Sequence, residues 1–466
     1  MAVLAFAALN LTFRLGREIV TDWDESLYAI SALEMRANGH WIGTTFLGAL
    51  DYYNSKPPLN VWLIALAFKL FGANLVSLRL VSVVSAWLTV AVLQGWSRRI
   101  IGPAVALLSG IILSTSFGFI YVHSGRSANP DALFTLLILL TAVTVWAMEE
   151  RPTRIIWLGP IAAAVFLLRG MAVLMVATIV AAAWAARPAR QRSWTPPVIA
   201  LLLFAIPVTA WVAARWQLDQ WQFLERLFTY DFLARSFTVI EEHPGTPLYY
   251  LNILQKHQFD WMLAAAVAWW LYPIPWPKLG TFIAFWRGHD ALSAVLGAWS
   301  ASVLIVPTLM RTKLPWYLNT FYPVFALGTA WILVHALCPV PGAPRTGKRR
   351  MAVAAVLVIV IAAAESRLLW YSFHYRDLGH SSQGLLLAER ERLGGALVFR
   401  DHWNHGDLFV LEGVAGGRHR DATSLEDFVR NSRPGDYLLS SEAIEERCLS
   451  LVQSNERYRL YRRFVE

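Results

Sequence analysis

Five basic side chains stand at or near the ends of apolar segments, where a chain that crosses a membrane carries few of them on its outer side. They are Lys56, Arg126, Arg169, Arg311 and Lys313. A long cationic side chain can reach the lipid headgroups, which is the simpler explanation for any single one. Five at a similar depth, together with Asp24 and Asp131, instead predict a polar cavity at the outer leaflet. Its cations would hold the phosphate of an amphiphile, and its carboxylates would serve as acid or base.

The first of these acids lies at the start of a helical pattern that runs from Thr21 to Gly39. Asp22 and Glu25 have the spacing of a capping box, and apolar residues then repeat every three or four positions. We therefore expect an amphipathic helix along the membrane surface, with Asp22 as its N-cap. Asp24 and Glu25 are both candidate catalytic residues, although the helix dipole alone would favour an acid at Glu25.

The candidates for a metal site are weaker. His243 follows two acids in Glu241-Glu242-His243-Pro244 and could join a carboxylate in binding a divalent ion, but a solvated loop histidine is the simpler alternative. The two cysteines, Cys338 and Cys448, fall on opposite sides of the membrane in the topology below, so no disulfide is expected. No glycine-rich phosphate-binding motif occurs, and nothing predicts a nucleotide site.

The composition identifies the class of protein that must position these residues. Of 466 residues, 56% are hydrophobic and 16% are charged, against roughly 25% charged residues in soluble domains. This excludes a disordered chain, a disulfide scaffold and an ordinary cytosolic enzyme. The basic residues sit in short islands between apolar runs, so the net charge of +9 indicates membrane topology and not a nucleic-acid surface.

Apolar segments long enough to cross a bilayer, or nearly so, recur along the chain. They are 76–96, 103–121, 131–148, 155–168, 171–186, 196–214, 257–275, 290–308, 317–338 and 351–369. Met1–Thr12 is shorter than a span needs, so we expect a first helix whose start lies upstream, which gives about eleven spans. Leu59–Phe71 follows Pro57-Pro58 and is too short to cross, so it predicts an interfacial helix.

Cations in alternate loops orient the chain by the positive-inside rule. The cytoplasmic set is Arg98, Arg99, Arg151, Arg154, Arg187, Arg190, Arg192, Lys278, Arg287, Arg345, Lys348, Arg349 and Arg350. We therefore expect a membrane domain at 1–369, with a first outer loop at 14–75, and a soluble extracytoplasmic α/β domain at 370–466. In that domain the pattern predicts strands at Ala396–Phe399, Leu408–Leu411, Tyr437–Leu439 and Arg457–Val465, and helices at Ser424–Asn431 and Glu442–Val452.

Four motifs resemble those of the GT-C glycosyltransferases in the superfamily of protein O-mannosyltransferases and lipid A aminoarabinose transferases. They are Asp24-Glu25-x-x-Tyr28, Lys56-Pro57-Pro58-Leu59, Arg126-x-x-x-x-Asp131 and Thr312-Lys313-Leu314-Pro315-Trp316-Tyr317. The resemblance covers about residues 15–335 and implies a polytopic α-helical membrane protein of GT-C type. It also implies an inverting transfer of a sugar from a polyprenyl phosphate to a lipid, glycolipid or protein acceptor, at the outer face of a bacterial inner membrane.

The resemblance also assigns roles to residues. Asp24 corresponds to the acid expected to act as general base or to orient the acceptor, and Lys56 to the lysine that binds the lipid phosphate. Arg169-Gly170 takes the place of a frequent Lys-Gly. Tyr28, Asp131 and Tyr317 belong to the matched motifs or their surroundings and would line the substrate pocket.

Two departures leave other functions open. The aminoarabinose transferases carry Glu where this chain has Ser55, a position implicated in metal binding, and Arg where it has Leu27. No cofactor is therefore expected with certainty, and a divalent ion remains one alternative. A non-catalytic glycolipid-binding scaffold is another. A flippase for polyprenyl-phosphate-linked glycolipids is a third, although such transporters usually carry inverted repeats, which we do not find.

Overall fold

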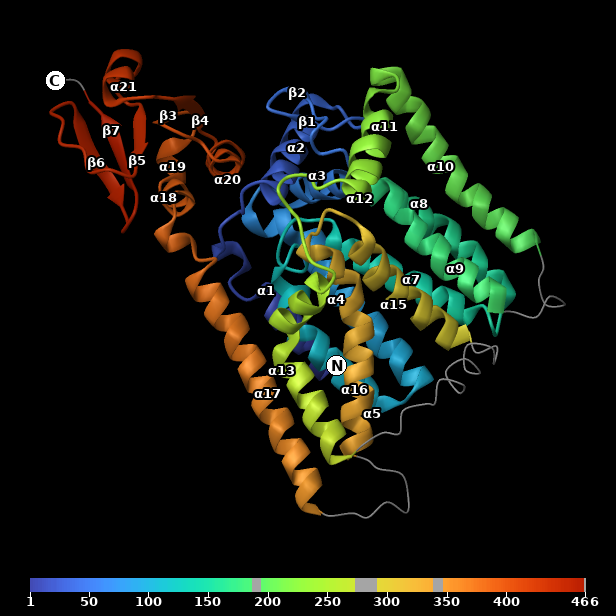
Figure 1. The fold of residues 1–466 in the computed structure, drawn as a ribbon. Helices are drawn as coiled ribbons and strands as arrows, with labels where there is room; N and C mark the ends of the chain where they lie inside the picture. The colour runs from blue at the N-terminus through green and yellow to red at the C-terminus, as the bar shows by residue number, and fades with distance from the viewer. Residues whose placement is uncertain (187–193, 273–290, 338–346, 465–466) are drawn as a thin grey trace.

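The structure is a computed structural model that describes residues 1–186, 194–272, 291–337 and 347–464. A bundle of helices forms most of the molecule, and a small sheet lies at one end of it (Figure 1). We call this end the sheet end. The helices of the bundle are α1 (Ala2–Thr12), α4 (Leu75–Ile100), α5 (Pro103–Ser114), α6 (Phe117–Tyr121), α7 (Asp131–Ala147), α8 (Leu158–Arg169), α9 (Val173–Ala186), α10 (Thr195–Asp219), α13 (Tyr249–Leu271), α15 (Ala291–Leu309), α16 (Tyr322–Leu337) and α17 (Gly347–His374).

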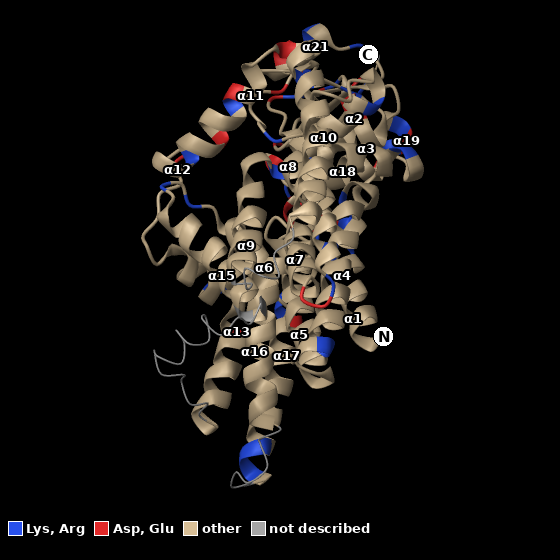
Figure 2. Ribbon diagram, turned by 90° about the vertical axis from the view of Figure 1, so that its right-hand side faces the viewer, with Lys and Arg blue, Asp and Glu red and all other residues tan. Residues whose placement is uncertain are grey.

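Five segments of the described chain are long and apolar enough to cross a membrane. They are Leu75–Ile100, Pro152–Ala185, Thr195–Asp219, Pro315–Leu337 and Gly347–His374. Charged residues gather toward the sheet end, and basic residues mark the far end of α17 (Figure 2). The apolar helices of a membrane protein are thus present, and the count of about eleven spans stays a prediction.

The expected spans match these helices with some local differences. The segment 103–121 is broken into α5 and α6, and α13 begins earlier than expected, at Tyr249, and is kinked at Gln258. The spans predicted at 155–168 and 171–186 are separated at Arg169-Gly170, between α8 and α9. Several of the cations used to orient the chain, namely Arg187, Arg190, Arg192, Lys278, Arg287 and Arg345, and also Cys338, lie outside the described residues.

Two short helices and a hairpin follow α1 at the sheet end: α2 (Asp24–Asn38), β1 (Thr45–Phe46) paired with β2 (Ala49–Leu50), and α3 (Leu59–Phe71). The bounds of α3 are those predicted for the interfacial helix. Gly39 ends α2 with a positive φ of 73°, a conformation that glycine adopts freely, as the Asn38-Gly39 signal predicts. The expectation of one buried face on α2 was wrong for its first half, which is buried on all sides.

The C-terminal residues form a five-stranded sheet with the order β4-β3-β5-β7-β6. Its strands are β3 (Leu397–Arg400), β4 (Arg418–Asp421), β5 (Tyr437–Ser440), β6 (Leu449–Ser454) and β7 (Arg459–Arg463). The pairs β3–β4 and β3–β5 are parallel, and β5–β7 and β6–β7 are antiparallel. Helices α18 (Ser382–Ala388), α19 (Arg390–Leu393), α20 (His405–Leu408) and α21 (Leu425–Asn431) accompany the sheet.

Three of the predicted strands and one predicted helix correspond to β3, β5, β7 and α21, and Ser424 caps α21 by accepting from the amide of Asp427. Two predictions were wrong. Leu408–Leu411 is helical, because this apolar run is buried on every side, a pattern that helices and strands share. Glu442–Val452 is not a helix, since its second half pairs with β7 as β6.

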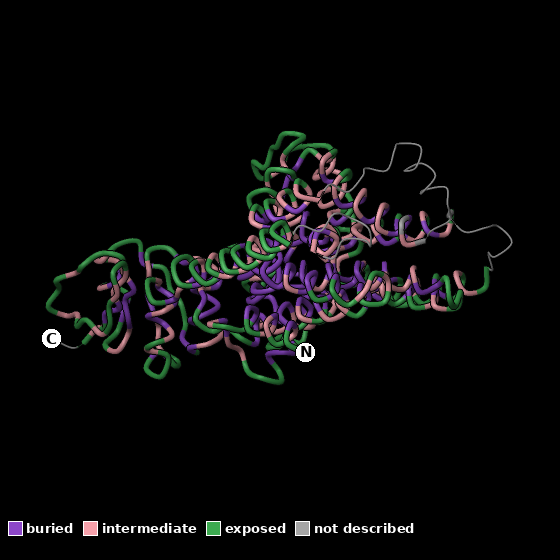
Figure 3. The backbone as a smooth tube through the Cα atoms, turned by 90° about the horizontal axis from the view of Figure 1, so that it is seen from below, coloured by how far each residue is buried: buried purple, intermediate pink, exposed green. Residues whose placement is uncertain are grey.

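The first loop and the C-terminal region share one hydrophobic core. Side chains of α2 and α3 pack against α18, α20 and the helical turn Phe409–Ala415. Phe68 of α3 stacks on Phe409 at 5.8 Å between ring centroids. Seen from below, buried residues fill the interior of the bundle and also the sheet region (Figure 3). This shared core explains why α2 is buried all round where we expected one exposed face.

Candidate active site

The charged and phenolic side chains that surround Asp24 lie at the sheet end of the bundle, and we call them the polar cluster. Its members are Asp24 and Tyr28 of α2, Lys56, His123, Asp131 of α7, Arg169 of α8, Asp231, Arg235 and Tyr317. They come from segments spread over most of the chain. Each one lies close enough to another member for a direct contact or an electrostatic interaction.

Asp24 is the first residue of α2, because the helix begins one residue later than expected. Trp23 occupies the N-cap position with φ 67° and makes no side-chain cap. The prediction that Asp22 caps this helix was therefore wrong. Its carboxylate instead accepts from the amide of His405 at 3.0 Å, in the C-terminal region. This contact turns Asp22 away from the helix and leaves Asp24 at the head of α2.

The Asp24 carboxylate lies 3.5 Å from Nδ1 of His123 and is about one third exposed. Burial alone would raise its pKa, but the positive charges of Lys56 and His123, with Arg235 and Arg169 further off, outweigh burial and lower it. Asp24 is thus ionised at neutral pH. Lys56 and Asp24 therefore lie close enough to interact electrostatically.

Lys56 precedes α3 and is positioned by the turn before it. Asp51 accepts from the amides of Tyr53 and Asn54, and the Asn54 side chain accepts from the Lys56 ammonium at 3.4 Å. The ammonium also lies 5.6 Å from the centre of the Tyr28 ring. Burial alone would lower the pKa of Lys56, but Tyr28 and Asp24 raise it above its ordinary value.

Within the described chain, no carboxylate lies within ion-pair distance of Lys56. The other two strong cations of the polar cluster are paired. Arg169 lies 2.6 Å from Asp131, and Arg235 lies 3.2 Å from both Asp231 and Glu241. Lys56 is therefore the cation with the most unused capacity for an anion.

Arg169 and Asp131 join the ends of α8 and α7. The Arg169 side chain also lies over the ring of Phe134, one turn along α7. Gly170, which follows, has φ 52°, and a Cβ there would lie 2.7 Å from Cδ1 of Leu227. Glycine is required at this turn for both reasons, and the turn aims Arg169 at Asp131.

The sequence patterns missed two parts of this cluster. Asp231 and Arg235 lie in and after the π-helical turn Leu227–Ala234, within a polar loop where acids and bases are too common to stand out. His123 carries no motif either. Its ring stacks on Trp316 at 3.8 Å between centroids, and its φ of 51° is unusual outside glycine. Such a conformation persists only where the surroundings hold it.

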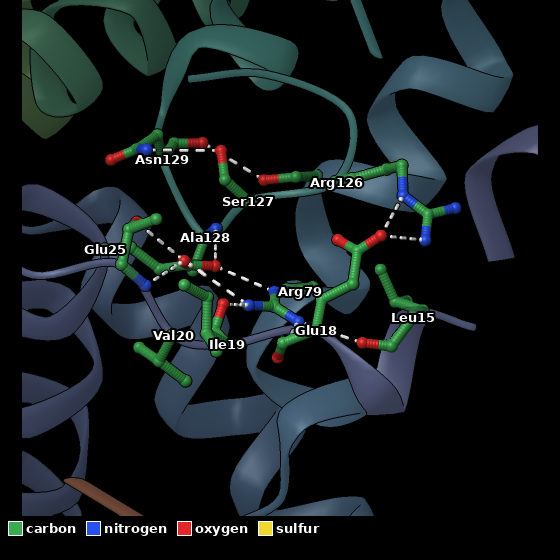
Figure 4. Close-up of polar contacts among 12 residues, drawn as sticks. Leu15, Glu18, Ile19, Val20, Glu25, Arg79, Arg126, Ser127, Ala128 and Asn129 are labelled. Atoms are coloured by element: carbon green, nitrogen blue, oxygen red, sulfur yellow. Dashed lines mark hydrogen bonds and ion pairs between the residues drawn. The ribbon is translucent and has the colours of Figure 1, made fainter. Parts of the chain in front are cut away.

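Two predicted site residues lie instead in a buried ion-pair network beside the cluster. Glu25 is fully buried and pairs with Arg79 of α4 at 2.8 Å (Figure 4). Arg126 pairs with Glu18 and donates to the carbonyl oxygens of Asn10 and Phe13. Every charge in this network has a protein partner. Neither Glu25 nor Arg126 is therefore presented to a substrate, and we keep neither as a candidate for direct contact with one.

The last two predicted cations also lie elsewhere. The Lys313 ammonium donates to the carbonyl oxygens of Pro307, Thr308 and Met310, at the end of α15. Its three protons are thus engaged in closing that helix. Arg311 is exposed and interacts through its backbone with Ser236. The five cations do not converge on one point, and the phosphate-binding prediction is retained for Lys56 and Arg169.

His243 is exposed, and its carbonyl oxygen accepts from the amide of Lys313. Among the described residues, no three His, Cys, Asp or Glu side chains are grouped so that they could hold a metal ion. The residues present thus do not form a metal site around His243. Ser55, which is buried, supplies no carboxylate there either.

Known proteins resemble this chain in sequence and in fold. Residues 55–213 match the family described as dolichyl-phosphate-mannose-protein mannosyltransferase. The chain is 27% identical over 387 residues to undecaprenyl phosphate-alpha-4-amino-4-deoxy-L-arabinose arabinosyl transferase 2 of Pseudomonas fluorescens. The matched region covers 81% of this chain and 60% of that protein. A transferase of the same name from Pseudomonas aeruginosa is 30% identical over 67% of this chain and 56% of its own length.

Solved structures give the fold. The crystal structure of ArnT from Cupriavidus metallidurans bound to undecaprenyl phosphate superposes with a TM-score of 0.69 at 15% identity, over 99% of this chain and 97% of that one. This likeness shows that the chain has the same fold as ArnT. The archaeal oligosaccharyltransferase AglB of Archaeoglobus fulgidus is a more distant neighbour, with a TM-score of 0.50 over 90% of this chain and 64% of its own. The chain spans 56–60% of the length of the curated relatives named above.

Proposed function

We propose that this GT-C protein is an inverting glycosyltransferase that moves a sugar from a polyprenyl phosphate to a lipid, glycolipid or protein acceptor. The observation that carries the proposal is Lys56, a cation without a carboxylate partner among the described residues. It lies over the ring of Tyr28 and close enough to Asp24 to lower its pKa. The names of the relatives support it, since they are undecaprenyl-phosphate aminoarabinose transferases, and so does the ArnT structure with bound undecaprenyl phosphate.

In the proposed reaction, a hydroxyl or phosphate oxygen of the acceptor attacks the anomeric carbon of the donor sugar. The bond from that carbon to the donor phosphate breaks, and its electron pair leaves with the phosphate oxygen, which Lys56 and Arg169 stabilise. Where the acceptor is a hydroxyl, its proton passes to Asp24, and where it is a phosphate, Asp24 orients the attacking group. Attack from the face opposite the phosphate inverts the anomeric centre.

Donor binding would itself prepare Asp24 as a base. In the free protein, nearby cations lower the pKa of Asp24 and make it a weak proton acceptor. A donor phosphate beside Lys56 would offset that positive charge, and the pKa of Asp24 would rise. Asp24 would therefore gain basicity only when a donor is present, and water would be activated less in its absence.

We also propose that the sheet end faces the outside of a bacterial inner membrane, with residues 370–466 as an extracytoplasmic domain. The basic residues at the opposite end of α17 support this orientation. The apolar helices are consistent with about eleven spans, and the core shared with α2 and α3 holds the domain against the membrane region.

The test is transfer by the purified full chain in detergent, given an undecaprenyl-phosphate aminosugar and a lipid A acceptor. Asp24→Asn and Lys56→Ala should each lower transfer at least 100-fold, while Asp421→Asn and Lys69→Ala, which change exposed residues of the same types, should not. Mass spectrometry of the acceptor distinguishes transfer from the flippase alternative, because transport forms no new covalent bond. Full activity of either site variant would overturn the proposal.

A further inference from the structure

The segment that leads to Asp24 is held at several points by the C-terminal region, in addition to the contacts that Arg79 makes with its first residues. It runs from Glu18 to Trp23 with little regular structure of its own. Glu18 forms an isolated antiparallel bridge with Asp377, and the amide of Ile19 donates to the carbonyl oxygen of Arg376 at 2.8 Å. The backbone of this segment is thus paired with residues more than 350 positions away.

Gln383 makes the most specific of these contacts. Its side-chain oxygen accepts from the amide of Val20 at 2.8 Å, and its side-chain nitrogen donates to the carbonyl oxygen of Val20 at 2.9 Å. The two bonds reproduce the pairing of a neighbouring strand, and Gln383 is only 5% exposed. A buried amide that satisfies both polar groups of one residue fixes the position and the direction of that residue.

The next contact is made by Asp22, two residues after Val20 in the sequence. Asp22 accepts from the amide of His405 and lies 3.3 Å from its Nδ1. Gly406, adjacent to His405, packs so closely that a Cβ there would lie 2.6 Å from both the Val20 oxygen and the Gln383 nitrogen. Gly406 therefore permits the close approach of these two segments.

The residues that hold the segment are themselves fixed. Asp407 is fully buried, accepts from the Ser382 hydroxyl at 2.7 Å and pairs with Arg400 at the end of β3. These contacts tie α18, α20 and the sheet into one unit. Arg376 faces both Glu18 and Glu25 at 3.6 and 3.7 Å, so this unit also reaches the buried network beside α2.

We propose that the C-terminal region acts as a clamp that positions Asp24, with Gln383 as its main positioning residue. The proposal rests on the proposed function in one respect, namely that Asp24 acts on the acceptor. Gln383 does not touch substrate. It sets the path of residues 18–23, and thereby the place of the Asp24 carboxylate relative to Lys56 and His123. Lys56 is held by its own turn at Asn54, outside the clamp.

This separation makes the prediction specific. Loss of the clamp should displace Asp24 and leave Lys56 in place, so chemistry should slow while donor affinity is kept. Gln383→Leu removes both bonds to Val20, and Gly406→Ala pushes the same two segments apart without changing any polar group. Gln453→Leu, at an exposed glutamine of β6, is the matched control.

The experiment measures kcat and donor KM of the full chain in detergent, together with hydrogen exchange of peptides that cover residues 15–23. We expect kcat to fall at least ten-fold in Gln383→Leu and Gly406→Ala, donor KM to change less than two-fold, and exchange to rise in residues 15–23 but not in α3. A kcat of the wild-type value in both variants would overturn the clamp. A parallel change in kcat, KM and exchange throughout the chain would also overturn it, since that indicates general unfolding.

Hydrogen exchange distinguishes failure of the clamp from failure of the proposed function. If the wild-type chain transfers no sugar, the proposed function fails, yet the exchange of residues 15–23 still reports whether Gln383 holds them. Unchanged exchange in both variants would overturn the clamp whatever the activity.

Discussion

Replacing Arg79 of α4 by methionine should be among the most destabilising single changes at the sheet end of the bundle. The Arg79 guanidinium bonds to Glu25 at 2.8 Å and to the carbonyl oxygens of Leu15, Glu18 and Ile19 at 2.6–3.1 Å, and both charged side chains are fully buried. Removing one partner of a buried ion pair typically costs about 3–5 kcal/mol, because the other charge stays in a poorly solvated place.

The pKa of Glu25 gives a second route to this magnitude. Burial alone would raise it, but Arg79 and Arg376 lower it from 4.5 to about 2. A difference of this size between the folded and unfolded states corresponds to about 3 kcal/mol of stability. Because the folded pKa is the lower one, this stability is present above pH 4.5 and is lost as the pH falls toward 2.

The assay is equilibrium unfolding of the full chain in detergent at pH 7 and at steps down to pH 3. Arg79→Met should lose about 3–5 kcal/mol at pH 7, and Glu25→Gln should lose less as the pH falls. The double variant should lose less than the sum of the two single variants. Arg392→Met is the control, because Arg392 pairs with Glu389 at the surface, where a pair contributes less than about 1 kcal/mol. A loss in Arg79→Met equal to that of the control would refute the buried network.

Three further outcomes follow from the site. In a pH–rate profile, the acid limb of kcat should lie at higher pH than that of kcat/KM. The reason is that the donor phosphate offsets the cations that lower the pKa of Asp24 in the free protein. Acid limbs at the same pH would contradict this. Lys313→Met should lower the free energy of unfolding by about 1–3 kcal/mol, measured by thermal unfolding, and leave donor affinity unchanged. The control Lys256→Met, on the exposed side of α13, should change neither quantity. Weaker donor binding by Lys313→Met would show that Lys313 belongs to the donor site. Gly170→Ala should lower the free energy of unfolding by more than about 1 kcal/mol and slow transfer by moving Arg169. The control Gly95→Ala, in open space on α4, should change neither quantity. Equal effects of the two variants would show that the turn at Gly170 does not require glycine.

The elements that sequence patterns predict well are those with strong local signals. α3 has the predicted bounds because two prolines precede a short apolar run, and α2 ends at Asn38-Gly39 because glycine favours that backbone conformation. The start of α2 was placed wrongly, because the capping spacing of Asp22 is a local signal that a tertiary contact overrides. His405, almost 400 positions later, takes the Asp22 carboxylate.

The same reasoning explains the candidate site. Asp24, Lys56 and Arg169 lie in motifs whose membrane placement could be inferred, and the structure brings them together. Arg126 and Lys313 looked equivalent in sequence, because a cation at the end of a span has the same local context whether it faces a substrate, an acid such as Glu18, or the carbonyl oxygens of a helix end. Only long-range contacts separate these cases. His123 was missed because its stacking on Trp316 joins residues far apart in the chain.

The most direct test of the central idea separates donor binding, assigned to Lys56, from chemistry, assigned to Asp24. Binding of undecaprenyl phosphate and of the sugar-bearing donor should be measured for wild type, Asp24→Asn, Lys56→Ala and the Lys69→Ala control, alongside single-turnover transfer. We expect Lys56→Ala to lose donor affinity at least ten-fold, and Asp24→Asn to bind the donor at least as tightly as wild type while transferring no sugar. Wild-type donor affinity in Lys56→Ala, or sugar transfer by Asp24→Asn at the wild-type rate, would contradict the account.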